Sequence, residues 1–336
     1  MSDKLLISPN VMKAEFVRVL LSIGFSAGKA EKCAEIFTQN SVEGIYSHGV
    51  NRFPRFVGNT TDGFVKPETE PVLLMHTGSL EQWDGQLGPG PLNAVFATER
   101  AMDLADKGSI GMVTLANTNH WMRGGTYGWQ AAKKGYVFIG WTNTIANMPA
   151  WGAVDQHLGN NPFVLAVPYK NEAIVLDMAM SQFSYGKMEM YEQEGRNLPC
   201  FGGYNKQGKL TVKPGEVLES WRPVPIGYWK GAGFSLLLDI LATVLSGGLA
   251  THEISKRQTE YSISQVFMAI RIGSLSNFPM IENTIQGILS DYKLSVPEEP
   301  GTQIRYPGES IVETRNRNIR DGIPVNKDVW ETILKL

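Results

Sequence analysis

The chain lacks the features that mark several large classes of protein. Only two of its 336 residues are cysteines, Cys33 and Cys200, which excludes a disulfide framework or a zinc knuckle and fits a reducing compartment. The formal net charge is -2 and no block of Lys and Arg occurs, which argues against nucleic acid as a partner. The N-terminus, MSDKLLISPN, has no long apolar run, so we expect no signal peptide and a cytoplasmic protein.

A membrane span is also not expected. The most apolar helical run, residues 234–250, carries Asp239 and two consecutive glycines, so a core helix is the better interpretation. Apolar residues make up 43% of the chain and charged residues 19%, which provides for a substantial core and excludes disorder. We therefore expect a globular protein of enzyme size with no membrane partner.

The hydrophobic periodicity predicts helices at both ends and an α/β section between them. Ser8 and Pro9 are typical of a helix start, Ser26 of a second, and Pro91 of a third. Short apolar runs predict buried strands at 110–116, 136–141, 163–167, 173–177 and 265–272. The segment 202–215, rich in Gly, Asn, Lys and Gln, is predicted to be a surface loop.

The standard dinucleotide fingerprint is absent. A G-x-G-x-x-G motif should follow a strand, but Gly88 and Gly90 are followed by Asn93 where the third glycine belongs. Gly231 and Gly233 follow Tyr-Trp-Lys rather than a strand. A Rossmann nucleotide site is therefore not inferred from this sequence.

Two of the five histidines stand in polar, glycine-containing loops after regular elements. His48 lies in YSHGVNRFPRF, and His120 follows the strand predicted at 110–116, where α/β proteins gather ligands. Histidine moves protons near neutral pH. If the stretch after His48 is helical, Arg52 shares its face and could grip a carboxylate with two hydrogen bonds. A functional role is the favoured interpretation for both histidines, and an ordinary helix-surface position is the alternative for Arg52.

Other classes remain open at this point. His48, His120 and Asp177 could ligate a metal in a hydrolase or lyase, although no H-x-x-x-H or C-x-x-C spacing supports a metal site. A non-catalytic module that binds a sugar acid in the same pocket is another possibility. The segment 176–182 is predicted to end a strand and to begin a helix, whose free N–H groups would suit phosphate.

Six blocks in fixed order give a more specific indication. The sequence resembles the malate/L-lactate dehydrogenase-like family of NAD(P)-dependent oxidoreductases over nearly its whole length, and within it the branch that reduces a diketo sugar acid. The blocks are SHGVNRFPRF, NHWMRGGTYGWQAA, GNNPF, LDMAMSQFSYG, PIGYWKGAGFS and RYPGES.

The resemblance implies a fold, a cofactor and an assembly. It implies an α/β fold whose NAD(P)-binding mixed sheet is not of the Rossmann type, with a helical domain from both ends of the chain. We expect a helical part at 1–75, a nucleotide-binding part at 76–275, and a C-terminal helical part at 276–336 that packs on the first. A homodimer is implied, with NADH as cofactor and NADPH as the other candidate, and a small sugar acid as substrate. The missing ligand spacing leads us to expect no metal.

The resemblance also assigns residues. His48 is implied to be the catalytic proton donor to the keto oxygen that receives the hydride, and Arg52, Asn119 and His120 to bind substrate. The residues implied to bind the cofactor are Leu176, Asp177, Met178, Ala179, Met180, Ser181, Gln182, Trp229, Lys230, Gly308, Glu309 and Ser310. Other small 2-keto acids or cyclic imine acids are the alternative substrates.

Overall fold

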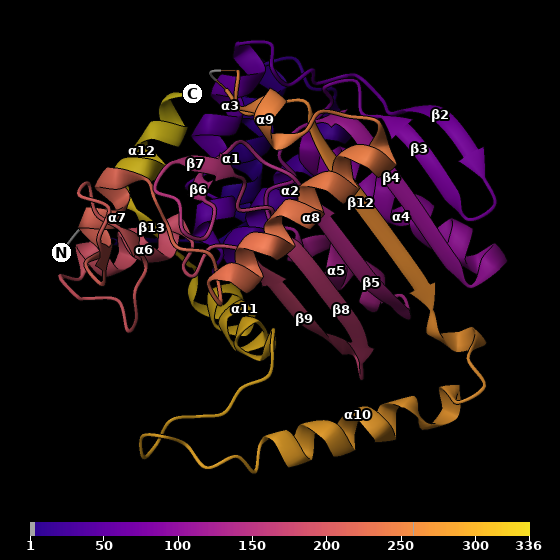
Figure 1. The fold of residues 1–336 in the computed structure, drawn as a ribbon. Coiled ribbons are helices and arrows are strands. Elements are labelled where there is room, and N and C mark those ends of the chain that lie inside the picture. Colours follow the sequence, from indigo (N-terminus) through magenta and orange to yellow (C-terminus); the bar gives the residue numbers. More distant parts are fainter. Residues whose placement is uncertain (1–3, 258) are drawn as a thin grey trace.

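The computed structural model describes residues 4–257 and 259–336, and this part of the chain is built on a seven-stranded mixed sheet (Figure 1). β3 and β4 are parallel, and the other neighbours pair antiparallel. In sheet order the strands are β2 (Val72–Thr77), β3 (Leu80–Asp84), β4 (Ile110–Thr118), β12 (Ile263–Arg271), β5 (Tyr136–Thr142), β8 (Phe163–Tyr169) and β9 (Glu172–Met178). The predicted non-Rossmann mixed sheet is confirmed, and β2 and β3 are strands that the sequence did not reveal.

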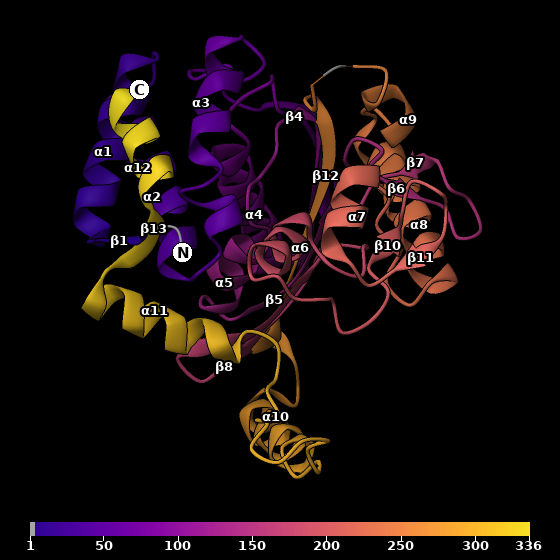
Figure 2. The same cartoon turned by 90° about the vertical axis from the view of Figure 1, so that its left-hand side faces the viewer.

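Helices cover both faces of the sheet (Figure 2). On one face lie α4 (Gly90–Gly108) and α5 (Gly125–Ala132), and on the other lies α8 (Trp229–Ser246). β12 shows why its sequence is a continuous apolar run: Phe267 belongs to the core under α4 and α5, whereas Val266 packs in the core under α8. A strand buried on both faces cannot alternate apolar with polar residues.

The helix α8 is only partly the core helix that the sequence predicts. It is long and apolar enough to cross a membrane, but it packs against β4, β5 and β12. Its Asp239 accepts hydrogen bonds from the Asn143 side chain and the Thr251 backbone N–H, both at 2.9 Å. Its outer face is apolar and exposed, which a buried core helix would not be.

Both ends of the chain build a helical part beside α4 and α5 (Figure 2). β1 (Lys4–Ile7) pairs antiparallel with β13 (Ile323–Asn326), which brings the two ends together. Phe16, Phe37 and Phe53 form an aromatic cluster at its centre, with the Phe16 and Phe53 ring centroids 4.0 Å apart. The helices of this part are α1 (Pro9–Ser22), α2 (Ala27–Val42), α3 (Phe53–Thr61), α11 (Glu309–Asp321) and α12 (Lys327–Lys335).

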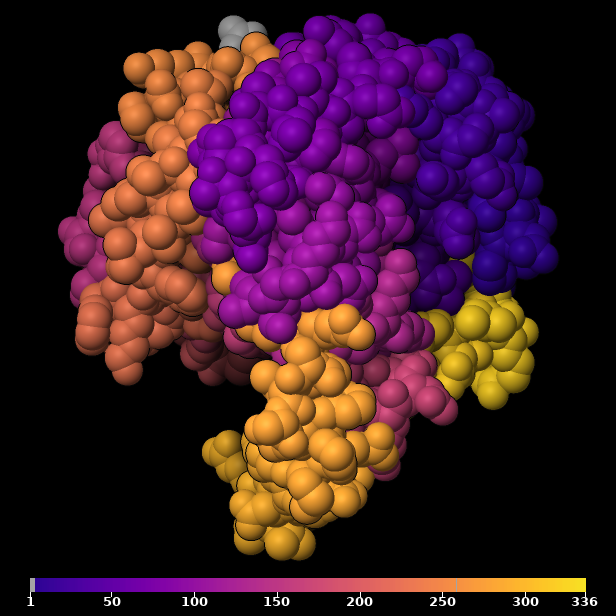
Figure 3. All heavy atoms as spheres, turned by 90° about the vertical axis from the view of Figure 1, so that its right-hand side faces the viewer, coloured from indigo at the N-terminus to yellow at the C-terminus, as the bar shows by residue number. Residues whose placement is uncertain are grey.

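The helix α10 (Phe278–Tyr292) stands away from the body as an arm, as the space-filling view shows (Figure 3). It lies within the expected C-terminal part, 276–336, yet only the chain from α11 onward packs on the N-terminal helices. The sharper division therefore falls between α10 and α11, and the domain boundaries stay a prediction.

Short elements join these layers. The predicted surface loop 202–215 contains a small hairpin and the start of a helix, which corrects that expectation. The short elements are β6 (Met148–Pro149), β7 (Gln156–Leu158), α6 (Tyr185–Gln193), β10 (Gly203–Tyr204), β11 (Leu210–Thr211), α7 (Pro214–Ser220) and α9 (Thr251–Ile254).

A buried carboxylate in β3 yields a test of stability. Glu81 is 0% exposed and accepts hydrogen bonds from Arg100 Nε at 2.8 Å and Nη2 at 2.7 Å, and from Trp83 Nε1 at 3.0 Å. Burial alone would raise the pKa of Glu81, but hydrogen bonds from Arg100, His76 and Trp83 outweigh it and hold the pKa at about 2.

Arg100→Met is expected to lower the free energy of unfolding by about 3 kcal/mol at pH 7, because it leaves Glu81 charged and without its cation. The measurement is urea denaturation. Glu81 titrates at about pH 4.3 in the unfolded chain, so its contribution is complete above that pH and is lost as pH falls toward 2. The gap between variant and wild type should therefore narrow below pH 4, and a constant gap would contradict this interpretation.

Candidate active site

The structure brings His48 and His120 face to face. His48 ends the short 3-10 turn Tyr46–His48 that follows α2, and His120 lies just beyond the carboxyl end of β4. Their ring centroids are 5.7 Å apart with the ring planes at 29°. Two histidines far apart in sequence thus share one site between the helical part and the sheet.

The loop that carries His120 is held by the residues around it. The side-chain nitrogen of Asn119 donates to the backbone carbonyls of Phe64, Leu87 and Gly88 at 2.8–3.1 Å. The Trp121 side chain is buried, and the backbone carbonyl of Trp121 accepts a hydrogen bond from the Tyr127 hydroxyl. The site residue predicted at Asn119 therefore braces the loop with its amide nitrogen.

A backbone contact fixes the protonation state of His120. The N–H of Met122 donates to Nδ1 of His120 at 2.9 Å, so Nδ1 must carry a lone pair. The ring is then neutral with its proton on Nε2. Burial, followed by the charge of Arg52 and the presence of His48, lowers the pKa of His120 well below its usual value. His120 is therefore a fixed hydrogen-bond donor rather than a group that gains and loses a proton.

His48 has no such restriction. Its Nδ1 lies 3.0 Å from the hydroxyl of Ser47, which can donate or accept. Burial and the charge of Arg52 lower the pKa of His48 to about 4, so the imidazole is neutral at pH 7 before any anion binds. Of the two rings, His48 is the one whose contacts allow a change of protonation.

Arg52 contributes charge without sharing a helix with His48. The turn with His48 ends at Gly49, and Arg52 is the N-cap of the next helix, α3. The predicted common helical face of His48 and Arg52 therefore does not form. Burial lowers the pKa of Arg52, as does nearby Arg55, whereas Glu260 opposes that shift. Sequence reasoning missed Arg55 and Glu260, whose charges both act on Arg52. Glu260 is remote from Arg52 in sequence, so only folding brings its charge near.

The residues predicted to bind cofactor lie along the edge strand β9 and beyond it. Near one end, the carbonyl of Pro307 accepts a hydrogen bond from Val175 N–H at 3.1 Å, which sets the 308–310 turn against the strand. Gly308 has φ +90°, and a Cβ there would lie 3.2 Å from Val175 N, so glycine suits this turn. The structure thus places 308–310 beside the start of 176–182.

The other end of this segment meets the start of α8. Gln182 N–H donates to Val224 O and Ile226 N–H donates to Met180 O, both at 2.8 Å, shortly before Trp229 and Lys230. Residues 176–182 are an extended connection with no helix, so the predicted helix start is wrong; the next helix, α6, begins at Tyr185. All three predicted cofactor segments therefore lie along one extended path.

A group of buried charges escaped the sequence analysis. Glu43 and Arg123 form an ion pair in which both side chains are nearly inaccessible, and Arg315 also binds Glu43 at 2.9 Å. Arg123 lies 4.0 Å from Asp177, whose carboxylate accepts a hydrogen bond from Gly125 N–H at 2.8 Å. Single charged residues scattered along a sequence carry no signal of such a cluster.

No metal site is apparent in residues 4–257 and 259–336, because no three potential ligands gather there. Asp177, weighed as a ligand, is engaged with Arg123 and Gly125 instead. Burial raises the pKa of Asp177, and the charge of Arg123 and the Gly125 N–H partly offset that rise.

The fold and the site together suit a class of enzyme that handles a small acid, because a protonatable imidazole, a fixed N–H donor and a guanidinium converge at one place. The comparisons define that class. The family model for malate/L-lactate dehydrogenase matches residues 7–334, so the chain belongs to the malate/L-lactate dehydrogenase family.

Curated relatives agree with this assignment. A 2,3-diketo-L-gulonate reductase of Escherichia coli is 44% identical over 327 residues, which cover 97% of this chain and 98% of the relative. One from Citrobacter koseri is 42% identical over 326 residues, with the same coverage. The predicted family and oxidoreductase class are confirmed: the chain is an oxidoreductase that acts on a hydroxy or keto acid with a nicotinamide cofactor.

Solved structures share the fold over almost the whole chain. The malate dehydrogenase of Pyrococcus horikoshii superposes with a TM-score of 0.89 at 27% identity, and the match covers 100% of this chain and 97% of the dehydrogenase chain. The sulfolactate dehydrogenase of Methanocaldococcus jannaschii gives 0.89 at 25% identity, with coverage of 98% and 95%. The helical part and the mixed sheet are thus features of a family fold.

The charge of Arg52 is expected to add to the effect of burial in lowering the pKa of His48. In Arg52→Met the pKa of His48 should rise from about 4 toward its ordinary value, because one of the two causes of the shift is removed. NMR titration of labelled histidines would measure it, and the five histidines in the chain keep the spectrum simple. Arg55→Met is the matched control, and a larger rise there than in Arg52→Met would contradict this assignment.

Proposed function

We propose that the chain reduces 2,3-diketo-L-gulonate to 3-keto-L-gulonate with NADH, with His48 donating the proton to the oxygen at C2. The family and the curated relatives support the reaction class and the sugar-acid substrate. Another small 2-keto acid or a cyclic imine acid is the alternative substrate.

One observation carries the proposal: His48 and His120 face each other beside Arg52, and only His48 is left able to change its proton. Reduction of a ketone at C2 needs a proton for the oxygen that becomes a hydroxyl. It also needs a donor that stabilises the developing negative charge without losing its own proton. His48 suits the first role, and the Nε2–H of His120 suits the second.

The low pKa of His48 has a consequence for the order of events. The free protein holds His48 neutral at pH 7, so His48 must take up a proton as the substrate binds. A substrate carboxylate bound to Arg52 would cause this uptake, because it offsets the positive charge that helps to lower the pKa of His48. In the reverse direction, the neutral imidazole of the free protein is ready to accept a proton from a hydroxy acid.

Arg52 is the proposed partner of the C1 carboxylate. Its guanidinium can bind both oxygens at once and so fix the orientation of the neighbouring carbonyl. Its partial burial and its nearness to the two histidines, whose pKa values both respond to its charge, support this role. His120 would then donate to the keto oxygen through Nε2–H, while its Nδ1 stays bound to the Met122 N–H.

The residues along β9 fit a nicotinamide dinucleotide. The helices α8 and α11 begin at Trp229 and Glu309, and no side chain in the described part of the chain caps either start, so their first N–H groups suit phosphates. The carboxylate oxygen Oε2 of Glu309 is buried with no hydrogen-bond partner in that same part. A ribose hydroxyl would satisfy this oxygen, while the other oxygen of Glu309 is paired with the Lys293 ammonium. When bound, the reduced nicotinamide supplies the hydride.

His48→Asn is expected to lower kcat for reduction of 2,3-diketo-L-gulonate by about 10²- to 10⁴-fold, the usual contribution of a general acid. NADH affinity should stay near the wild-type value, because His48 lies outside the proposed cofactor segments. Arg52→Lys is expected mainly to raise KM, by about 10- to 100-fold, because a point charge replaces a guanidinium that binds both oxygens. Loss of absorbance by the reduced nicotinamide measures both.

The assay is run with NADH and NADPH in parallel and with a chelator present. Unchanged turnover in His48→Asn would remove His48 as the acid. Turnover with another 2-keto or cyclic imine acid, but none with the diketo acid, would contradict the proposed substrate and leave the proposed roles of the residues standing. Activity lost in chelator would favour metal chemistry, and acid binding with no oxidation of NADH would favour a binding module.

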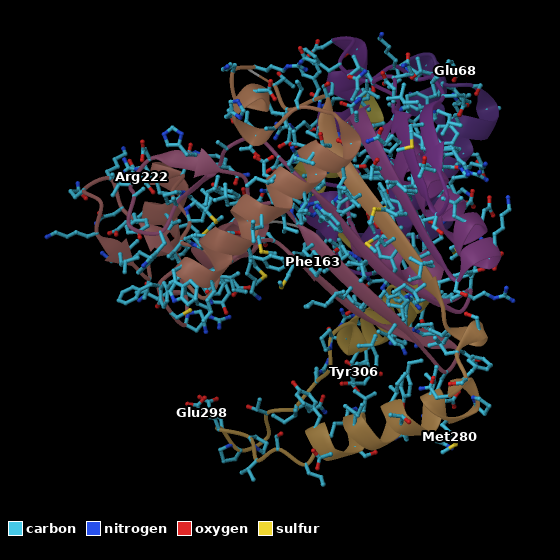
Figure 4. The ribbon with its side chains drawn as sticks, turned by 45° about the vertical axis from the view of Figure 1, so that its right-hand side comes forward. Glu68, Phe163, Arg222, Met280, Glu298 and Tyr306 are labelled. Carbon is cyan, nitrogen blue, oxygen red and sulfur yellow. The ribbon has the colours of Figure 1, made fainter. Side chains whose placement is uncertain are left out.

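We also propose that the protein works in the cytoplasm as a homodimer formed through α8 and the α10 arm. A helix with one face on the sheet and a contiguous apolar face in solvent is typical of an interface. The arm also carries exposed apolar side chains, and Figure 4 shows Met280 on it, well away from Phe163 in the sheet. The exposed apolar residues of α8 are Trp229, Phe234, Leu236, Leu237, Ile240, Leu241 and Val244.

Leu237→Glu is expected to convert the dimer to a monomer, because a carboxylate would have to be buried in an apolar interface. Light scattering coupled to size exclusion measures the mass. Val11→Glu, at a position of similar exposure on α1, is the control and should leave the mass unchanged. A dimer that persists in Leu237→Glu would move the interface away from α8.

A further inference from the structure

The last turn of α2 contacts both histidine loops. Asn40 is fully buried; its side-chain nitrogen donates to the carbonyl of His48 at 2.9 Å. Its side-chain oxygen accepts a hydrogen bond from the Thr126 hydroxyl at 2.7 Å, at the start of α5. One amide therefore joins the backbone of His48 to the helix that follows the His120 loop.

Glu43, three residues after Asn40, makes the second connection. It is 4% exposed, and its Oε2 pairs with Nη1 of Arg123, three residues after His120. Its Oε1 accepts hydrogen bonds from Arg315 Nε at 3.0 Å and from the Gln39 side chain. The carboxylate thereby ties the end of α2 to the His120 loop and to α11.

The His48 loop is packed against the same turn with little space to move. Ser41 Oγ accepts a hydrogen bond from Val50 N–H at 2.9 Å. A Cβ at Gly49 would lie 2.3 Å from Ser41 Oγ and 2.9 Å from Ser41 N, so only glycine allows this close approach. The backbone on both sides of His48 is thus fixed by α2.

The charge network extends to the proposed cofactor path. Arg123 lies 4.0 Å from Asp177, which receives the Gly125 N–H. Burial lowers the pKa of Arg123 to about 10, which still leaves the guanidinium charged at pH 7. The connection is therefore a constant ion pair across the working pH range rather than a group that titrates.

Stability alone is a poor explanation for these residues. Burying an ion pair costs desolvation energy that its attraction often fails to exceed, and apolar residues in its place are frequently as stable. The position of the pair suggests another role, because a misplacement of about 1 Å between reacting groups can cost about 10²-fold in rate. His48 and His120 come from separate parts of the fold, so their spacing needs a common support.

We propose that Asn40 and Glu43 are positioning residues that fix His48 and His120 relative to each other for proton donation to the substrate. This inference rests on the proposed function for its effect on rate. Its geometric content, that the end of α2 holds the two rings in place, stands apart from which acid is reduced.

Asn40→Ala and Glu43→Gln are expected to lower kcat by about 10- to 100-fold, with NADH affinity near the wild-type value. Arg123→Lys keeps the charge and is expected to retain more activity than Glu43→Gln. Glu81→Gln is the matched control, because it neutralises another buried glutamate paired with an arginine, on β3. It should lower the urea midpoint as Glu43→Gln does while leaving kcat unchanged.

A second readout does not depend on turnover. NMR titration in the full-length protein should show the pKa of His48 rising from about 4 toward its ordinary value in Asn40→Ala and Glu43→Gln, because a loosened loop exposes the ring. Glu81→Gln should leave it unchanged. If Glu43→Gln does not fold, Asn40→Ala and Arg123→Lys test the same connection.

The outcomes separate the two proposals. Folded variants with unchanged kcat and an unchanged His48 titration would overturn the positioning role. A fall in stability equal to that of Glu81→Gln, with kcat unchanged, would overturn it as well and leave the residues purely structural. If the wild type reduces none of the candidate acids, the proposed function fails, while a shifted His48 titration would still support the positioning role.

Discussion

The buried carboxylate of Glu43 is the constraint on which the rest of the site depends. It pairs with Arg123, in the loop that follows His120, and with Arg315 on α11. The end of α2, the His120 loop and α11 are remote in sequence, and they meet at this one carboxylate. An uncompensated charge in this place would be costly, and two guanidiniums with further hydrogen bonds compensate it. The helical part is therefore held to the sheet by a contact that tolerates little displacement.

The two histidines are held in different ways. The His120 loop is anchored on each side of the ring, by Asn119, Trp121 and Met122, and the last of these fixes its tautomer. His48 is held through its backbone by Asn40, so its ring keeps the freedom to titrate. In the proposed reaction, one rigid donor and one titratable acid would act on the same oxygen, with the charge of Arg52 beside them.

Much of the fold could be predicted from the sequence, and the particular elements show why. The strands at 110–116, 136–141 and 265–272 were visible because strands buried on both faces are continuous apolar runs, and the strand at 163–167 is an equally continuous apolar run although Leu165 is exposed. β2 was not, because its side chains are mostly exposed and its pattern is mixed. The helix start predicted within 176–182 was wrong, because pairing with residues 224–226 keeps the end of that segment extended.

The sequence by itself determined the family, the absence of a Rossmann fingerprint and the choice of His48 and His120 as candidate functional residues. Ordered motifs and local periodicity are properties of neighbouring residues, so they can be read without the structure. Only the tertiary structure decided that His48 and His120 meet, that Met122 fixes one of them, and that Asn40, Glu43 and Arg123 support both. Those contacts join residues whose separation along the chain is large, and local sequence carries no record of which distant partner will satisfy a buried charge.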